Sequence, residues 1–242
     1  MERTAIVTGG AKRIGAAISR ALAADGWHVL IHYNRSRAEA ERLAEEIGGS
    51  IVQAELADPG AAERIVGAAS MPLGLLVNNA SRFVYDSAED FSVSDWDVHL
   101  DVNLRAPALL SRAFAARAEE GMIVNLLDSK LAAPNPDFFT YTLSKIGLAG
   151  LTELTARAFA PRIRVNAIAP SVTMVSGPQS RDNFEKVHAL NALERGIDVA
   201  DIVRALRFLI DTPVITGQTI TLDGGQRFLG LARDVQFLEN DR

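Results

Sequence analysis

The strongest constraint on the fold is a regular alternation of short β-rich segments with longer amphipathic segments along all 242 residues. β-branched and apolar residues dominate the short segments, whereas the longer ones repeat apolar residues at helical spacing. Strands separated by helices need crossover connections, which join parallel strands. The pattern therefore predicts an α/β fold with a doubly wound parallel sheet, buried on both faces by helices.

The expected elements can be placed by residue number. Strands are expected at 4–8, 27–33, 50–56, 73–79, 122–128, 162–169 and 218–223. Helices are expected at 14–24, from the second strand to residue 46, and at 61–69, 94–118, 138–159 and 199–209. The polar segment 171–184, which contains Gly and Pro and follows a strand end, is the candidate for a mobile lid. No linker or repeat divides the chain, so residues 1–242 are expected to form one domain.

Composition excludes several classes of function. The formal net charge is -5 and the basic residues are scattered, so we expect no nucleic-acid partner. There is no cysteine, hence no disulfide and no thiolate nucleophile. No apolar run reaches membrane-spanning length and the N-terminus is too polar for a signal peptide, so we expect a soluble, cytoplasmic protein with no membrane partner. The four histidines lack metal-ligand spacing, and no metal site is expected.

The first expected strand is followed by the glycine-rich turn TGGAKRIG, residues 8–15. Gly9 and Gly10 permit a tight turn with the backbone close to a ligand, and Gly15 lets the next helix approach the sheet. The N-terminus of that helix offers N–H groups to a phosphate. The turn lacks the G-x-G-x-x-G pattern, so taken alone a purely structural turn remains an alternative.

The end of the second expected strand indicates which dinucleotide would bind. An enzyme that prefers NAD places Asp or Glu there, to accept from the ribose 2′-hydroxyl. This chain has donors instead, Asn34, Arg35 and Ser36, and Arg13 in the glycine turn could reach the same 2′-phosphate. NADP(H) is therefore favoured over NAD(H), although Arg35 could simply be a solvated surface charge.

Residues 128–145, DSKLAAPNPDFFTYTLSK, contain a pair typical of proton-transfer sites. Tyr141 and Lys145 are four residues apart and therefore share one face of a helix. A lysine in that place can stabilise the phenolate and poise the tyrosine as a proton donor. The pair by itself also occurs in ordinary helices.

Several motifs appear in a fixed order along the chain. They are the turn at 8–15, NNA at 78–80, VN at 102–103, YxxxK at 141–145, RVNAIAPS at 164–171 and TGQTITLDGG at 216–225. Together they resemble the short-chain dehydrogenase/reductase family over nearly the whole length. The resemblance implies a single Rossmann-type domain with a seven-stranded sheet, a homotetramer, and hydride transfer between NADPH/NADP+ and a small-molecule substrate.

The resemblance also implies roles for individual residues. Asn103, Tyr141 and Lys145 would form a proton relay. Asn79 would lie near the cofactor ribose, and Glu55 and Leu56 near the adenine. Combined with the turn and the 2′-phosphate donors, the expected cofactor contacts are Gly9, Lys12, Arg13, Ile14, Gly15, Asn34, Arg35, Ser36, Glu55, Leu56, Asn79, Ala80, Ser81, Tyr141, Lys145, Pro170 and Ser171.

Two departures from the common family pattern narrow the resemblance. Arg13 stands where most members have a third glycine, and Asp128 stands where most have the catalytic serine, thirteen positions before Tyr141. Both changes resemble pteridine reductases and the related bacterial dihydromonapterin reductases. In that branch Ser81 and Phe83 match a serine and an aromatic ring that stacks on the pterin. The resemblance thus implies Ser81, Phe83, Asp128 and Tyr141 as substrate contacts.

The chemistry of the two substrate classes gives Asp128 a reason. Reduction of a ketone builds negative charge on oxygen, which an ionised carboxylate would oppose. A dihydropterin instead offers N–H and amino donors to a carboxylate, and one of its ring nitrogens must be protonated after hydride reaches the adjacent carbon. The expected function is therefore NADPH-dependent reduction of dihydromonapterin or dihydrobiopterin, with weak activity on dihydrofolate.

Alternatives remain open at this stage. Asp128 could cap or brace the loop before Pro134, with Ser129 acting as the usual hydroxyl donor of a ketone or 3-oxoacyl reductase. Phe83 could be a core or loop anchor. The chain could also be a non-catalytic NADP(H)-binding sensor, because fold alone does not establish function. The tail at 226–242 could dock at a subunit interface, cover the site through Phe228, Leu229 and Phe237, or be frayed.

Overall fold

A computed structural model describes residues 3–175 and 179–238 of the chain, so the expectations for 176–178 and 239–242 lie outside the described residues. The described strands form one parallel sheet of seven, in the order β3-β2-β1-β4-β5-β6-β7. The strands are β1 (Thr4–Val7), β2 (His28–Tyr33), β3 (Ser50–Gln53), β4 (Leu73–Asn78), β5 (Gly121–Leu126), β6 (Ile163–Pro170) and β7 (Thr219–Leu222). The chain first winds outward from β1 to β3 and then in the opposite direction to β7, which confirms the predicted doubly wound sheet.

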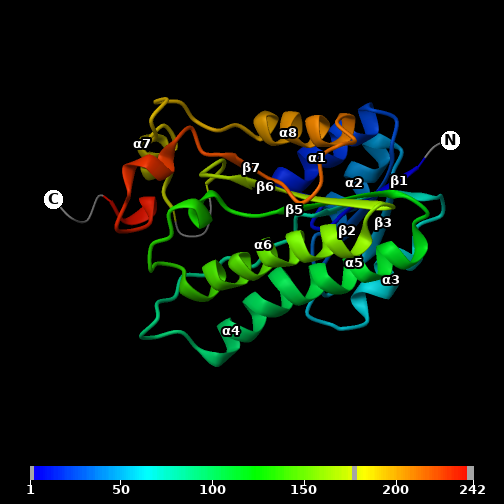
Figure 1. Ribbon diagram of the computed structural model, residues 1–242, viewed down its shortest axis with the longest axis horizontal. Helices are drawn as coiled ribbons and strands as arrows, with labels where there is room; N and C mark the ends of the chain where they lie inside the picture. Colours follow the sequence, from blue (N-terminus) through cyan, green and yellow to red (C-terminus); the bar gives the residue numbers. More distant parts are fainter. Residues whose placement is uncertain (1–2, 176–178, 239–242) are drawn as a thin grey trace.

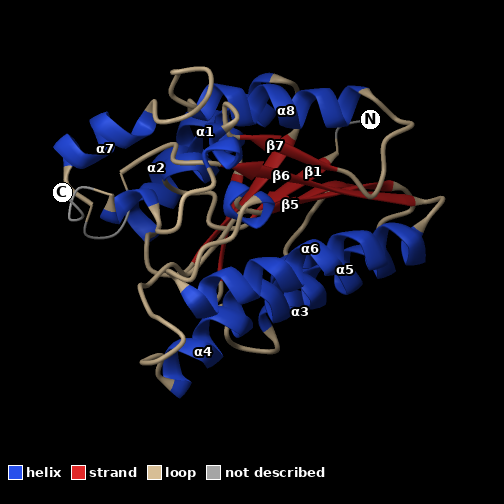
Figure 2. Cartoon of the chain, turned by 60° about the vertical axis from the view of Figure 1, so that its left-hand side comes forward, coloured by secondary structure: helices blue, strands red, loops and turns tan. Residues whose placement is uncertain are grey.

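Helices cover both faces of this sheet (Figures 1 and 2). One layer holds α1 (Arg13–Ala24), α2 (Arg37–Ile47) and α8 (Val199–Asp211), and the opposite layer holds α3 (Ala61–Gly67), α4 (Val93–Leu100), α5 (Ala106–Arg117) and α6 (Phe139–Phe159). Across residues 3–175 and 179–238, no helix combines the length and the apolar character needed to cross a membrane.

The two hydrophobic cores follow from the twofold period of the strands. All four residues of β1 are buried. Ala5 and Val7 pack in the core beneath α1 and α8, whereas Ile6 packs in the core beneath α3 and α5. A strand buried on both faces must be apolar at every position, which is why these segments are continuously hydrophobic.

The helix expected at 94–118 is interrupted. The residues Asp101–Arg105 form a π-helical turn between α4 and α5. Pro107 lies in the first turn of α5 and has no N–H, so it cannot donate to the carbonyl of Asn103 four residues earlier. One wider turn accommodates that missing bond, and such turns are frequent at functional sites.

The segment 171–184 was also predicted incompletely. Its second half begins α7 (Arg181–His188), in which the N-cap side chain of Ser180 accepts from the Asn183 N–H at 3.1 Å. The helix has two apolar residues, Phe184 and Val187, and this is too few for a clear helical period, although serine is a common N-cap residue. Between β7 and residue 238, the structure describes two short 3-10 turns, Gln226–Leu229 and Val235–Phe237, and the second lies against α7 (Figure 1).

Candidate active site

A cavity of about 630 Å³ opens at the carboxyl ends of β1, β4, β5 and β6. Ligands bind at this edge in open α/β sheets, because the loops that follow the strands converge there. Most of the predicted residues line it: Gly9, Lys12, Arg13, Ile14, Gly15, Asn79, Ala80, Ser81, Phe83, Asp128, Tyr141, Lys145, Pro170 and Ser171. The predicted residues outside its lining are Asn34, Arg35, Ser36, Glu55, Leu56 and Asn103.

The glycine turn has the geometry that a close backbone approach requires. A Cβ on Gly15 would lie 2.2 Å from the Gly9 carbonyl oxygen, and Gly9 itself has φ +60°. No side chain caps α1 at Lys12, which leaves the N–H groups of its first turn facing the cavity without a side-chain acceptor. The turn is therefore suited to a dinucleotide phosphate, and the predicted contacts of its residues stay a prediction.

Arg13 occupies an unfavourable backbone conformation. Its φ is 52°, in the left-handed region that costs a residue with a Cβ about 1–2 kcal/mol. A glycine would avoid this cost, and most members of the family that the chain resembles have glycine at this position. Because the exposed Arg13 lies at the rim of the cavity, the strain favours a functional role for its side chain.

His32 holds the turn from below. Its Nδ1 accepts from the Gly9 N–H at 3.1 Å, so its Nε2 carries the proton and donates to the Ala54 carbonyl at 3.1 Å. Burial lowers the pKa of His32 to about 4, partly opposed by the bond to Ala54 and by the charge of Glu55. Sequence reasoning found no grounds to place this histidine in the site, since the four histidines lack metal-ligand spacing. The structure places it against the cofactor turn.

The predicted 2′-phosphate donors are arranged unevenly at the end of β2. The Asn34 side-chain amide donates to Glu55 at 2.5 Å, and so it is already engaged. Arg35 is exposed, and Ser36 is the N-cap residue of α2 but makes no side-chain cap bond. Leu56 packs in the core, which removes its side chain from an adenine site.

Asp128 and Tyr141 form the centre of the candidate site. The Tyr141 hydroxyl donates to Asp128 Oδ2 at 2.8 Å, and Asp128 Oδ1 accepts from the Lys130 backbone N–H at 2.8 Å. The capping alternative is thus correct for one carboxylate oxygen, while the other binds the phenol. Ser129, the alternative hydroxyl donor, is 7% exposed and also lines the cavity.

Burial is the main influence on the electrostatics of Tyr141 and Lys145. Burial raises the pKa of Tyr141 well above its usual value, and the Asp128 charge and hydrogen bond raise it further. Burial also lowers the pKa of Lys145 to about 8, and its Nζ donates to the Leu126 carbonyl at 2.7 Å. Lys145 is not among the groups that shift the pKa of Tyr141, so the expectation that it poises Tyr141 by stabilising its phenolate stays a prediction.

Asn103 acts on the loop after β4. Its Oδ1 accepts from the Arg82 N–H at 2.7 Å and from the Ser81 hydroxyl at 3.2 Å, and its Nδ2 donates to the Ser144 hydroxyl at 3.0 Å. These bonds join the loop to α6, the helix of Tyr141. The predicted membership of Asn103 in a proton relay stays a prediction, because its side chain lies outside the cavity lining.

Phe83 is both an anchor and a cavity wall. Its ring stacks on Phe138 with centroids 4.3 Å apart at 18°, and it meets Tyr141 edge-on at 4.7 Å. Phe138 is buried and has φ 54°, a strained conformation for an aromatic residue at the start of α6. The anchor alternative therefore describes one face of Phe83, while the ring still lines the cavity.

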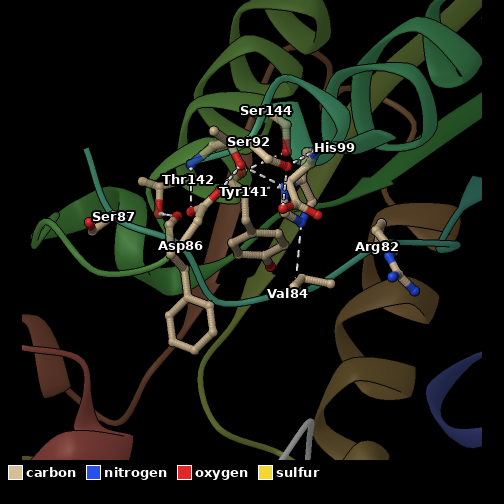
Figure 3. Close-up of polar contacts among 12 residues, drawn as sticks. Arg82, Val84, Asp86, Ser87, Ser92, His99, Tyr141, Thr142 and Ser144 are labelled. Atoms are coloured by element: carbon tan, nitrogen blue, oxygen red, sulfur yellow. Dashed lines mark hydrogen bonds and ion pairs between the residues drawn. The ribbon is translucent and has the colours of Figure 1, made fainter. Parts of the chain in front are cut away.

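A chain of buried polar groups connects the loop after β4 with the start of α6 (Figure 3). The Val84 N–H donates to His99 Nε2 at 3.3 Å, so His99 Nδ1 carries the proton and donates to the Thr140 hydroxyl at 2.7 Å. Thr140 in turn donates to Asp86 from its hydroxyl, and from its backbone N–H at 3.1 Å. The chain links the loop next to Phe83 with the residue before Tyr141. Burial lowers the pKa of His99, which favours the neutral ring that this pattern requires.

The C-terminal segment also lines the cavity of its own chain, through Gln226, Arg227, Leu231, Asp234, Val235 and Gln236. Sequence reasoning did not identify any of these as site residues. Of the three apolar residues singled out in the tail, Phe237 packs edge-on against Tyr85 at 5.1 Å, whereas Phe228 and Leu229 are 71% and 43% exposed. The predicted docking of the tail at a subunit interface stays a prediction.

Comparison with known proteins agrees with this geometry. A family model described as Enoyl-(Acyl carrier protein) reductase matches residues 9–227. The crystal structure of FolM alternative dihydrofolate reductase 1 from Brucella canis, complexed with NADP, is 40% identical with a TM-score of 0.84, and the match covers 93% of this chain and 94% of that one.

Two further relatives carry other names. 3beta-hydroxysteroid dehydrogenase 1 of Eggerthella lenta is 33% identical, over 92% of this chain and 93% of its own. The 3-oxoacyl-(acyl-carrier-protein) reductase of Staphylococcus epidermidis is 31% identical, over 93% of this chain and 99% of its own.

The structure combines a doubly wound sheet, a glycine turn suited to a phosphate, and a buried Tyr–Lys pair in one cavity. This combination defines a dinucleotide-dependent oxidoreductase. The chain belongs to the short-chain dehydrogenase/reductase family. Within that family it is similar to the alternative dihydrofolate reductases, which confirms the predicted resemblance to the pteridine reductase branch.

Proposed function

We propose that this oxidoreductase uses NADPH to reduce a dihydropterin to its tetrahydro form, with dihydromonapterin or dihydrobiopterin as substrate and dihydrofolate as a weaker one. The observation that carries the proposal is the Asp128 carboxylate, which accepts from the Tyr141 hydroxyl at 2.8 Å in the wall of the cavity. The relative from Brucella canis, named an alternative dihydrofolate reductase, supports a pterin-type ring as the substrate.

The residues at the glycine turn fit NADP(H). Gly15 lets the start of α1 pack closely against the Gly9 carbonyl, which shapes the turn for a phosphate, and Arg13 supplies a cation at the cavity rim. Asn79 donates to the Thr8 carbonyl at 2.8 Å, which fixes the turn against the loop after β4. When bound, NADPH supplies the hydride for the reduction.

The side chains around Tyr141 control the proton. Because its pKa is well above the usual value, Tyr141 keeps its hydroxyl proton at neutral pH and can donate it toward a ring nitrogen of the substrate. Asp128 retains acceptor positions for the N–H and amino groups of a pterin. When a substrate N–H or amino group donates to Asp128 Oδ2, the hydrogen bond from the Tyr141 hydroxyl to that oxygen weakens. The hydroxyl proton of Tyr141 then becomes easier to transfer to the substrate.

Ser129 is the basis of a second candidate, a ketone or 3-oxoacyl reductase. Its side chain lines the same cavity, and two relatives carry names of that kind. The two candidates make opposite demands on adjacent residues. A carboxylate suits a substrate with N–H donors, whereas a hydroxyl suits a substrate that develops an oxyanion.

The test is NADPH oxidation by the purified protein with dihydromonapterin, dihydrobiopterin, dihydrofolate and a simple ketone. We expect pterin turnover that collapses in Asp128→Ser and persists in Ser129→Ala. Ketone turnover that is lost in Ser129→Ala, without any pterin turnover in the wild type, would reject the pterin proposal in favour of the second candidate.

The assembly and location are proposed on similar grounds. Ile146 and Leu154 are 50% and 68% exposed on α6, and apolar side chains at the surface of a helix suit the homotetramer implied by the family. Analytical ultracentrifugation tests this assembly. We also propose a cytoplasmic location for the protein, where NADPH and dihydropterins would both be available.

A further inference from the structure

Residues 231–238 fold back onto the chain that carries them. Asp137, in the loop before α6, accepts from Arg233 Nε at 2.8 Å and from the Asp234 backbone N–H at 2.7 Å. Burial alone would raise the pKa of Asp137, but Arg233 and the Asp234 N–H lower it below its usual value. The Asp137 carboxylate, which is 4% exposed and binds both Arg233 and the Asp234 N–H, therefore attaches the tail to the loop before Tyr141.

A second attachment connects the tail to Lys130, in the segment that begins at Asp128. Lys130 Nζ donates to Asp234 Oδ2 at 3.2 Å and also to the Asp137 carbonyl, while the Lys130 backbone N–H donates to Asp128. The side chain of Lys130 is 8% exposed and that of Asp234 is 16% exposed. The tail is thus connected through one residue to the carboxylate that binds Tyr141.

Aromatic packing completes the attachment. The ring of Phe237 stacks on Phe138, with centroids 6.0 Å apart and an interplanar angle of 24°, and Phe138 also stacks on Phe83. The ring of Tyr85 meets both Phe138 and Phe237 edge-on. Such pairs are favourable beyond the area that they bury. The tail is therefore packed against the same rings that shape the substrate side of the cavity.

The attachment leaves Asp234 with acceptor capacity facing the cavity. Its Oδ1 accepts from the Gln236 N–H at 3.1 Å and its Oδ2 accepts from Lys130, whereas a carboxylate has about four acceptor positions. Burial raises the pKa of Asp234, Lys130 opposes the rise, and the Asp128 carboxylate adds to it. Two carboxylates on one wall, close enough to influence each other, suit a ligand with several N–H donors rather than a ketone.

We propose that residues 231–238 form the substrate-side wall of their own subunit's site, and that Asp234 is a specificity residue which, with Asp128, accepts hydrogen bonds from the N–H and amino groups of a nitrogen heterocycle. This assignment builds on the proposed function, because it takes the heterocycle to be the dihydropterin. It gives the tail a role in its own subunit, whether or not Phe228 and Leu229 also meet a neighbour.

The decisive experiment compares full-length Asp234→Asn with wild type at saturating NADPH. We expect the KM for dihydromonapterin to rise about tenfold or more, the loss of one hydrogen bond to a charged group, while the dissociation constant of NADPH stays within about twofold. Turnover of any ketone substrate should not fall. Asp211→Asn, at the exposed end of α8 and outside the cavity lining, is the matched control for loss of one carboxylate.

Amide hydrogen exchange distinguishes a direct substrate contact of Asp234 from the attachment of the tail by Asp137. Asp137→Asn should accelerate exchange across residues 231–238 and raise the same KM, whereas Asp234→Asn should raise the KM with a smaller change in exchange. Pterin turnover by wild type with an unchanged KM in Asp234→Asn would overturn this assignment alone. No pterin turnover by wild type would overturn the proposed function and this assignment together.

Discussion

His32 makes the cofactor turn sensitive to acid, and the size of the effect can be worked from the structure. The imidazole is 2% exposed and its pKa is lowered to about 4, against 6.5 for an ordinary histidine. Between these values the unfolded chain binds a proton that the folded chain excludes, so stability is complete above pH 6.5 and declines as the pH falls toward 4. At about 1.4 kcal/mol per pH unit, the loss amounts to about 3 kcal/mol of unfolding free energy.

The assay is urea unfolding from pH 7.5 to 4, on wild type and His32→Asn, with ordinary buffers at constant ionic strength. Asparagine can accept from the Gly9 N–H without titrating, so His32→Asn should lose about 3 kcal/mol less than wild type over this range, whatever its stability at neutral pH. His28→Asn, which removes an imidazole from the start of the same strand, should retain the dependence of the wild type. Parallel curves for wild type and His32→Asn would refute the reasoning.

Two further substitutions test other parts of the site. Arg13→Gly should raise the unfolding free energy by up to about 1 kcal/mol by relieving the left-handed backbone, while weakening NADPH about tenfold or more and NADH little. Thermal unfolding and titrations with both cofactors check this, and equal losses for the two cofactors would contradict it. His99→Leu should cost about 1–3 kcal/mol, because the Val84 N–H and the Thr140 hydroxyl lose their partner, and it should raise the KM of the substrate more than that of NADPH. Urea unfolding and steady-state kinetics measure both, and an unchanged stability would show that water replaces the ring.

The parts of the fold that could be predicted depend on short-range patterns. Continuous apolar strands and amphipathic helices follow from residues that are neighbours in sequence, and so the parallel, doubly wound sheet and its two helical layers could be predicted. The order of the strands depends on long-range pairing and was not predicted. The π-helical turn at Asp101–Arg105 depends on the loss of one backbone donor at Pro107. That signal was present in the sequence, but a periodic apolar pattern continues across it.

The tail could not be predicted for a different reason. Its attachment joins Asp137 to Arg233 and Asp234, nearly a hundred positions away, and such a pair has no local signature. The same applies to His32 and His99, whose roles depend on which backbone N–H each ring faces after folding. Contacts of this kind are determined by tertiary packing, which a single sequence does not display.

The residues that depart from local preference gather at the cavity. Besides Glu194, the residues other than glycine with positive φ in the described ranges are Arg13 and Phe138, one in the cofactor turn and one beside Tyr141. Asp128 replaces the hydroxyl of the common family pattern and raises the pKa of its own hydrogen-bond donor, Tyr141. Each feature costs free energy in the protein without ligands and is retained in a chain that otherwise follows its local preferences. We therefore expect the cofactor selectivity to depend on Arg13, and the choice of substrate to depend on Asp128 together with the proposed contact at Asp234.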